Sequence, residues 1–269
     1  MKYSTYHAHT EFCDGRSTAR QMILSAIERG CPEIGFSSHS PLPYSNDWSM
    51  RSERVGDYVS ELEKLKKEYE KQIKVYIGVE YDLISEPMEQ RFDYVIGSVH
   101  HVCAEGLRFD VDHTAQIQKD AFSVGFDGDS LSYAENYFSQ VAEIYDRTHC
   151  DIIGHFDLLL KFNERENLFD TGSRRYRDAR DAALERLLST PAVFEVNTGA
   201  ISRGYRTEPY PERAVLERIK AAGKPVVVTS DSHSADTVNF LLDETAEALE
   251  AQGIHCIRSM NELLSYTRR

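Results

Sequence analysis

The sequence predicts an α/β fold, a distorted TIM-like (β/α)7 barrel with a metal site at the C-terminal ends of its strands. Short apolar runs alternate with helical periodicity along the 269 residues, a pattern typical of a parallel sheet with crossover helices. Histidines and carboxylates follow most of the apolar runs, and the loops at the carboxyl ends of barrel strands converge on one place. No linker or change of composition divides the chain, so we expect one domain over residues 1–269.

Composition excludes several classes of partner. The chain has 31 Lys+Arg against 44 Asp+Glu and a net charge of −13, which repels nucleic acid and anionic membranes. A bound divalent cation would still make one pocket locally positive. The five cysteines are scattered without a Cys-x-x-Cys pair, which favours reduced thiols. No signal peptide and no apolar run near the ~20 residues of a membrane span are evident, so we expect a cytoplasmic protein.

The first half of the chain alternates strands with helices. Thr18 and Gln21 form a capping-box pattern for a helix that ends at Gly30. A second helix, over about 51–72, has apolar residues at three- and four-residue spacing and a charged opposite face. We expect strands at 2–6, 33–38, 73–79 and 94–99, a short helical piece between the last two, and a long functional loop over residues 103–130.

The second half continues the alternation and brings the count to seven strands. Ligand-type residues follow six of these strands, which suits a closed barrel better than an open doubly wound sheet, where function gathers at one switch point. The elements expected here are helices over 133–147, before Pro191 and from Pro211 to Gly223, strands at 151–154, 192–196 and 225–229, and two closing helices, the last capped by Ser259 with Glu262.

Candidate metal ligands gather at the predicted strand ends. His7 and His9 stand two residues apart in an extended segment, so their side chains point to one side and can close on one ion. A single histidine in such a loop is as often merely hydrogen-bonded, but six of the ten histidines share this placement. The full set is His7, His9, Asp14, His39, Glu80, His100, His155, Asp231 and His233.

This donor set predicts more than one ion. A tetrahedral ion takes four ligands, so nine nitrogen and oxygen ligands suffice for two or three divalent ions that share carboxylates. The mixture of imidazole and carboxylate favours Zn²⁺, Fe²⁺ or Mn²⁺ over Mg²⁺ alone. Two neighbouring ions can activate water and hold the oxygens of a phosphoryl transfer. The doublet His100-His101 is ambiguous, because strand alternation lets only one of the two point inward.

The ordered motifs resemble the polymerase and histidinol phosphatase (PHP) family along essentially the whole chain. They are His7-x-His9, Ser37-Ser38-His39-Ser-Pro-Leu-Pro, Gly78-Val-Glu80, Ser98-Val-His100, Gly154-His155 and Ser230-Asp-Ser-His233. The resemblance implies a (β/α)7 barrel with a three-metal centre, and it favours His100 over His101. Many relatives carry an acidic residue where this chain has Ser38, and some carry a histidine where Asp14 stands.

The resemblance also implies how the ligands divide among the ions. Glu80 would bridge two ions. The first would be held by His7, His9, Glu80 and Asp231, the second by Glu80, His100 and His155, and the third by Asp14, His39 and His233.

Three segments resemble the histidinol-phosphatase branch of the family: Ser-Pro-Leu-Pro after His39, residues 154–162, and Glu195-Val-Asn-Thr-Gly199. We therefore expect a metal-dependent phosphate monoester hydrolase that acts on L-histidinol phosphate in histidine biosynthesis. The alternatives are another phosphoesterase, acting on a nucleotide or phosphotyrosine, and a non-catalytic metal-stabilised module. A nuclease would need a row of Lys and Arg residues beside the site to bind a nucleic-acid backbone, and the sequence shows no such row.

We expect particular residues to contact the substrate. Asp231 or His233 would orient the attacking water or pass a proton. The residues expected to bind substrate are Lys161, Arg203, Arg206 and His101, with Asp110, Asp112 or Asp127 of the long loop facing a cationic group of the substrate.

Overall fold

The computed structural model describes residues 2–104 and 106–268 and contains one curled sheet of six parallel strands. Its strand order is β1-β2-β3-β6-β7-β8, in which each neighbour is parallel to the next. This arrangement confirms the expected α/β, TIM-like class. The strands are β1 (Glu33–Phe36), β2 (Lys74–Asp82), β3 (Tyr94–Ser98), β6 (Ile152–Ile153), β7 (Val193–Asn197) and β8 (Val226–Thr229).

The N-terminal segment joins the two edges of this sheet. Thr5 forms a parallel bridge with Ile34 of β1, and Ala8 forms another with Ser232 after β8. The expectation of a regular strand at 2–6 is wrong, because the segment makes single bridges to two neighbours instead of a continuous ladder to one. It nevertheless occupies the seventh place that the sequence predicts, and so it carries His7 and His9 into the middle of the fold.

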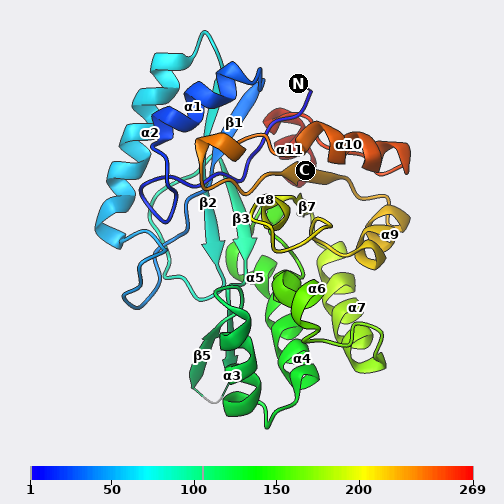
Figure 1. Ribbon diagram of the computed structural model, residues 1–269. Coiled ribbons are helices and arrows are strands. Elements are labelled where there is room, and N and C mark those ends of the chain that lie inside the picture. The colour runs from blue at the N-terminus through cyan, green and yellow to red at the C-terminus, as the bar shows by residue number, and fades with distance from the viewer. Residues whose placement is uncertain (1, 105, 269) are drawn as a thin grey trace.

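Helices surround the sheet, with α1 and α2 beside β1 and β2 and the last helices, α10 and α11, near the N-terminal segment (Figure 1). The predicted caps are confirmed, since Thr18 and Gln21 form a capping box and Ser259 accepts a hydrogen bond from the Glu262 amide. The helices are α1 (Ala19–Glu28), α2 (Val55–Tyr69), α3 (Ala115–Gly125), α4 (Ser130–Val141), α5 (Ile144–Thr148), α6 (Asn163–Glu166), α7 (Arg174–Leu188), α8 (Gly199–Ser202), α9 (Arg213–Ala221), α10 (Leu242–Ala251) and α11 (Met260–Thr267), with 3-10 turns at Ser52–Arg54, Leu158–Phe162 and Ala235–Thr237.

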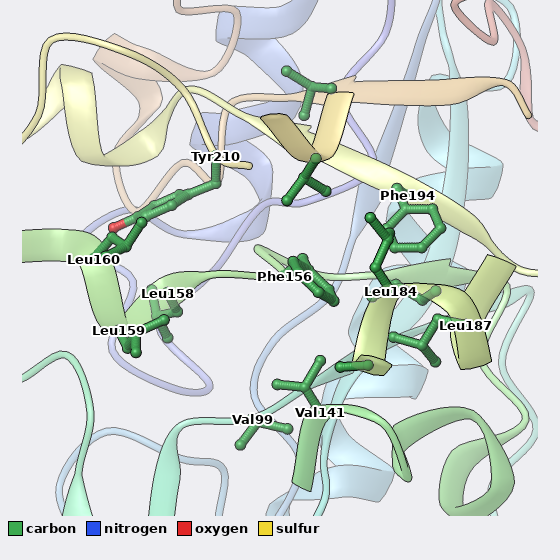
Figure 2. Packing of buried hydrophobic residues seen from close by; sticks show 14 of the residues in the cluster. Val99, Val141, Phe156, Leu158, Leu159, Leu160, Leu184, Leu187, Phe194 and Tyr210 are labelled. Carbon is green, nitrogen blue, oxygen red and sulfur yellow. The ribbon is translucent and has the colours of Figure 1, made fainter. Parts of the chain in front are cut away.

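The largest apolar cluster packs strands β6 and β7 against helices α4 and α7 (Figure 2). The cluster includes Phe156, Phe194 of β7, Val141 of α4, and Leu184 and Leu187 of α7, and all five side chains are buried. Burying one side chain of this size stabilises the fold by roughly 1.5–3 kcal/mol. The cluster continues into the apolar turn directly after His155 and therefore gives that histidine a rigid support.

Residues 103–130 differ most from expectation, because they form regular structure instead of a long loop. Strands β4 (His101–Ala104) and β5 (Leu107–Asp110) pair as an antiparallel hairpin, and α3 follows with Thr114 as its N-cap. Both strands have only four residues, and no residue of β5 is buried, so their apolar alternation is too weak to predict from sequence. In Figure 1 the hairpin and α3 lie beyond the ends to which the β2 and β3 arrows point, on the side where the site is expected.

Two smaller expectations are also wrong. No helix follows Glu80, because β2 continues to Asp82 and the chain then passes Pro87 without regular structure. The helix expected at 133–147 is two helices, α4 and α5, of which the first begins at Ser130 after the Asp129 cap. Within residues 2–104 and 106–268, no helix is long and apolar enough to cross a membrane.

Candidate metal centre

Glu80 is the residue on which the predicted ligands converge. Its Oε2 atom lies 3.2 Å from His7 Nε2 and 3.6 Å from His9 Nε2. The two histidines thus point to one side of the N-terminal segment, as their spacing predicts. The same oxygen lies 2.8 Å from His39 Nδ1, and all these side chains are buried.

The other oxygen of Glu80 faces two further strands. Oε1 lies 2.9 Å from His155 Nε2, after β6, and 3.3 Å from His100 Nε2, after β3. A carboxylate that has imidazoles at both oxygens is placed to bridge two cations. Of the doublet, His100 therefore faces the cluster, whereas His101 Nε2 lies 2.6 Å from the Tyr44 hydroxyl and 3.1 Å from Asp110 Oδ1.

A second carboxylate, Asp14, collects ligands nearer to solvent. Its Oδ2 lies 3.3 Å from His233 Nε2, and its Oδ1 lies 3.8 Å from His39 Nε2. The structure brings all nine predicted ligands into four overlapping groups whose donor atoms lie within 4.8 Å of one another. The groups are His9, Asp14, His39 and His233; His7, Glu80 and His155; His7, His9 and Asp231; and His39, Glu80 and His100.

Unpaired buried atoms show that these residues fit metal ions. The Nε2 atoms of His7 and His9 and Oε2 of Glu80 are buried and close together, but among the residues that the structure describes none of the three forms a hydrogen bond of acceptable geometry. A buried polar atom without a partner costs free energy, and a cation at this place would satisfy all three. Imidazole nitrogens mixed with carboxylate oxygens are the donors that Zn²⁺, Fe²⁺ and Mn²⁺ accept.

The charges of the cluster favour cations. Burial alone would raise the pKa of Glu80, but His7, His39 and His100 hold that pKa well below its ordinary value. Burial together with His233 and His39 lowers the pKa of His9 to about 3, so its imidazole is neutral at pH 7 and can offer a lone pair. Ionised carboxylates and neutral imidazoles are the ligand states that metal binding requires.

Glu195 orients two of the candidate ligands, and sequence reasoning missed it as a site residue. It accepts a hydrogen bond from His7 Nδ1 at 2.6 Å and one from the His155 amide at 2.7 Å. Because Nδ1 donates to the carboxylate, Nε2 of His7 keeps its lone pair for a metal. A glutamate in the middle of an otherwise apolar strand was the sequence feature that could have indicated this role.

Asp82 does the same for His100 and was also missed. Its Oδ2 lies 2.9 Å from His100 Nδ1 and accepts the His100 amide hydrogen at 3.1 Å. Asp82 lies two residues after Glu80 in β2 and therefore on the same face of that strand. The extension of β2 past Glu80 could not be predicted, and it is this extension that brings Asp82 to the site.

The backbone is unusual at Asp231, directly after β8. Its φ of 44° lies in the left-handed region, which a residue other than glycine adopts at a cost of order 1–3 kcal/mol. Asn197 Nδ2 donates to Asp231 Oδ2 at 3.3 Å. A Cβ atom on Gly199 would lie 2.8 Å from Asp231 Cβ, so glycine is required at that position. Neighbouring residues therefore impose the direction of this carboxylate.

Of the four residues expected to bind substrate, Arg203 lies closest to the ligands. It donates to Asp231 Oδ2 at 3.1 Å and to His233 Nδ1 at 3.2 Å, and its side chain is 30% exposed. Lys161 donates to Asp112 Oδ2 at 3.0 Å. Burial raises the pKa of Asp112, but Lys161, His100 and His155 lower it further than burial raises it, so that this pKa lies below its ordinary value.

Arg206 is directed elsewhere, since it donates to the carbonyl oxygens of Leu160 and Glu208 and lies over the Tyr210 ring. It supports the turn that carries Lys161. His101, the fourth expected residue, lies beside the cluster against Tyr44 and the β4–β5 hairpin.

The PHP domain family model matches residues 5–199, most of the chain. The chain belongs to the PHP family. The probable histidinol-phosphatase of Schizosaccharomyces pombe is 27% identical to this PHP protein over 271 residues, which cover 92% of this chain and 86% of the relative. The histidinol-phosphatase of Bacillus subtilis is 26% identical over 263 residues, covering 90% and 97% of the two chains.

Solved structures share the fold of this PHP protein. Histidinol phosphate phosphatase from Lactococcus lactis, complexed with zinc, L-histidinol and phosphate, superposes with a TM-score of 0.74 at 20% identity and covers 95% of each chain. A structure from Listeria monocytogenes gives a TM-score of 0.75 at 21% identity, with 88% of this chain and 97% of the other covered. Both likenesses extend over nearly the whole chain, as does the sequence similarity.

Proposed function

We propose that this PHP protein hydrolyses L-histidinol phosphate with two or three divalent ions, Zn²⁺, Fe²⁺ or Mn²⁺, bound in the Glu80 cluster. The observation that carries the proposal is the convergence of nine donor residues from the N-terminal segment and from strands β1, β2, β3, β6 and β8 or the turns after them. Within it, the buried atoms His7 Nε2, His9 Nε2 and Glu80 Oε2 have no hydrogen-bond partner among the described residues. Full-length similarity to histidinol-phosphatases supports the choice of substrate.

The nine candidate ligands would divide around the three carboxylates Glu80, Asp231 and Asp14. Glu80 would be shared between ions, because imidazoles face both of its oxygens. Bound divalent ions would supply Lewis acidity, which lowers the pKa of a coordinated water and neutralises charge on the phosphoryl oxygens. Glu195 and Asp82 hold the rings of His7 and His100 in the orientation that this role needs.

Arg203 is the residue that we assign to the phosphate group. Its guanidinium is anchored on Asp231 and remains partly exposed beside the ligands, so it offers donors to phosphate oxygens without a large change of position. Lys161, which Asp112 holds, would add a second positive charge to the site. Removing the side chain of Arg203 or Lys161 would weaken binding of the phosphate group but leave the metal ligands in place.

Asp231 and His233 are the residues that we assign to proton transfer. Asp231 Oδ1 lies 3.2 Å from His9 Nε2 and 3.6 Å from His233 Nδ1. Two titratable groups at this spacing can orient a water molecule and accept its proton as the oxygen attacks phosphorus. His233 is 21% exposed at its side chain, so the proton can pass on to solvent.

The proposal also covers the partners and the cellular location of the protein. The net charge of −13 suits a small substrate with a protonated amine and disfavours a nucleic acid or an anionic membrane. The scattered cysteines of the sequence support a reducing, cytoplasmic location.

Phosphate release from a panel of monoesters tests the proposed substrate. With metal-loaded protein, we expect kcat/KM for L-histidinol phosphate to exceed that for p-nitrophenyl phosphate by at least ~100-fold, equivalent to about 2.7 kcal/mol of transition-state binding. Values within threefold of each other would indicate a generalist phosphatase. The panel includes a nucleoside monophosphate and phosphotyrosine, and faster turnover of either would replace histidinol phosphate in the proposal.

A further inference from the structure

Trp48, the one tryptophan of the chain, lies over the candidate metal centre. Its ring centroid is 4.8 Å from that of His39, with the two rings nearly perpendicular at 87°. It lies 5.5 Å from the His100 ring and stacks on His101 at 5.6 Å with an interplanar angle of 28°. Two of these three neighbours are candidate metal ligands, so the indole forms one wall of the site.

The fold does not need this indole for its core. Trp48 belongs to none of the three apolar clusters of the described residues, neither as a buried member nor as a packed neighbour. It is partly exposed, and its sequence neighbours Asn46, Asp47 and Ser49 are polar. Its indole N–H has no hydrogen-bond partner within residues 2–104 and 106–268. A large aromatic side chain placed in this way beside reactive groups is available to a ligand.

The loop holds Trp48 in place before any ligand arrives. Asn46 Oδ1 accepts hydrogen bonds from the amides of Trp48 at 3.1 Å and Ser49 at 2.7 Å. The Met50 amide donates to the His39 carbonyl at 3.1 Å, which ties the end of the loop to a candidate ligand. Because the loop is already ordered, little conformational entropy is lost when the indole makes a contact.

Tyr44, the other aromatic residue of this loop, is already engaged on one face of its ring and at its hydroxyl. The Arg108 guanidinium lies 3.4 Å from its ring centroid, and its hydroxyl is engaged with His101 at 2.6 Å. Of the two aromatic side chains in the loop, Trp48 is therefore the one whose polar group has no partner among the described residues.

We infer that Trp48 recognises the alcohol part of the substrate. The inference rests on the proposed function, since it deepens the account of the same site. With phosphorus held between the ligands and Arg203, the indole provides a surface for a planar ring or a protonated amine on the alcohol side. Cation–π and stacking contacts of this kind are attractive and depend on the aromatic face. The substrate class is a phosphate monoester whose alcohol carries a ring or a cationic nitrogen.

Two substrates that differ only in the alcohol test this inference. In Trp48→Ala we expect kcat/KM for L-histidinol phosphate to fall on the order of 10-fold. For ethyl phosphate, which has neither ring nor charge, the change should stay below about threefold. Trp48→Phe should recover part of the loss because it keeps an aromatic face. Ser45→Ala, at an exposed position of the same loop, serves as the matched control and should behave as wild type.

A second readout does not depend on turnover. Trp48 is the chain's one tryptophan, so the tryptophan emission of the metal-loaded protein reports on this site. L-histidinol without phosphate should change that emission saturably, whereas ethanol at equal concentration should not. Metal content of each variant, measured alongside, shows whether the centre is intact.

The outcomes separate the inference from the proposed function. Equal losses on both substrates with the metals retained would mean that Trp48 shapes the reaction centre, and no loss on either would mean that it makes no contact; both overturn the inference. If the wild type does not prefer histidinol phosphate to ethyl phosphate, the proposed substrate fails. The inference then depends on the emission titration and on the ratio of ethanolamine phosphate to ethyl phosphate turnover, which Trp48→Ala should lower.

Discussion

Nδ1 of His7 lies 2.6 Å from Oε1 of Glu195, and both side chains are fully buried. The carboxylate can only accept, so the ring nitrogen must donate, and the opposite nitrogen is left as a lone-pair donor toward Glu80. Burial lowers the pKa of His7, but Glu195 and Glu80 raise it well above its ordinary value. In the absence of metal, these two carboxylates therefore favour a proton on His7 Nε2, the atom at which a cation would bind.

Glu195→Gln should weaken metal binding without unfolding the protein. The glutamine can still accept a hydrogen bond from His7, but it removes the negative charge that strengthens the imidazole as a ligand. Loss of such a partner costs about 10–100-fold in metal affinity. Competition with a chromogenic chelator measures this affinity, and Glu217→Gln, at an exposed helical position, is the matched control. Unchanged affinity in Glu195→Gln would contradict the orienting role.

Glu80→Ala and Arg203→Ala should separate metal binding from substrate binding. Glu80 faces imidazoles with both oxygens, so its removal should lower both metal content and turnover. Arg203 contacts Asp231 and His233 but is not one of the grouped ligands, so its variant should keep the metals while turnover or substrate affinity falls at least ~10-fold. Elemental analysis and steady-state kinetics decide the matter. Equal metal loss in the two variants would refute this division of roles.

His100→Ala and His101→Ala form a matched pair of neighbours. His100 Nε2 lies 3.3 Å from Glu80 Oε1, whereas His101 is engaged with Tyr44 and Asp110. We expect His100→Ala to lose at least part of the bound metal. His101→Ala should keep the metal but lose turnover, because Tyr44 beside the site loses its hydrogen-bond partner. The reverse pattern of metal content would assign the ligand to His101.

Asp157→Asn should remove a pH-dependent contribution to stability. Burial raises the pKa of Asp157 to about 6 from 3.8, so the folded state binds this proton more tightly than the unfolded state. The contribution is complete below pH 3.8 and is lost as the pH rises through about 6. Relative to wild type, the variant should therefore gain about 1–3 kcal/mol of unfolding free energy between pH 4 and pH 7.5.

Urea denaturation in the presence of EDTA measures this difference without any contribution from bound metal. Asp178→Asn, at an exposed position of α7, should show no such trend. A difference between Asp157→Asn and wild type that stays constant with pH would show that Asp157 titrates alike in the folded and unfolded states.

The central strands and the grouping of the nine candidate ligands could be predicted because each depends on a local pattern. Buried strands read as apolar runs, and a histidine after such a run lies at the carboxyl end of the sheet, where His39, His100 and His155 are found. Glu195 and Asp82 could not be assigned from sequence, because their roles depend on which strands lie side by side. The same holds for the β4–β5 hairpin, whose exposed strands carry little apolar signal.

Trp48 shows the same limit. Its sequence neighbours mark a polar loop, and only the tertiary structure brings its ring to His39. The register between β2 and β3, in which Asp82 pairs with Ser98, likewise places Asp82 beside His100. Local signals predicted which side chains could bind metal, whereas the residues that orient them required the fold.

A metal titration of chelator-stripped protein tests the central claim most directly. Phosphate release from L-histidinol phosphate is measured while Zn²⁺, Mn²⁺ or Fe²⁺ is added in increasing molar ratio to the protein. The account predicts negligible turnover without metal, a rise with added ion, and a plateau at two to three equivalents for at least one of the three metals. Turnover by the stripped protein equal to that of the loaded protein, or no turnover with any of these metals, would contradict the account.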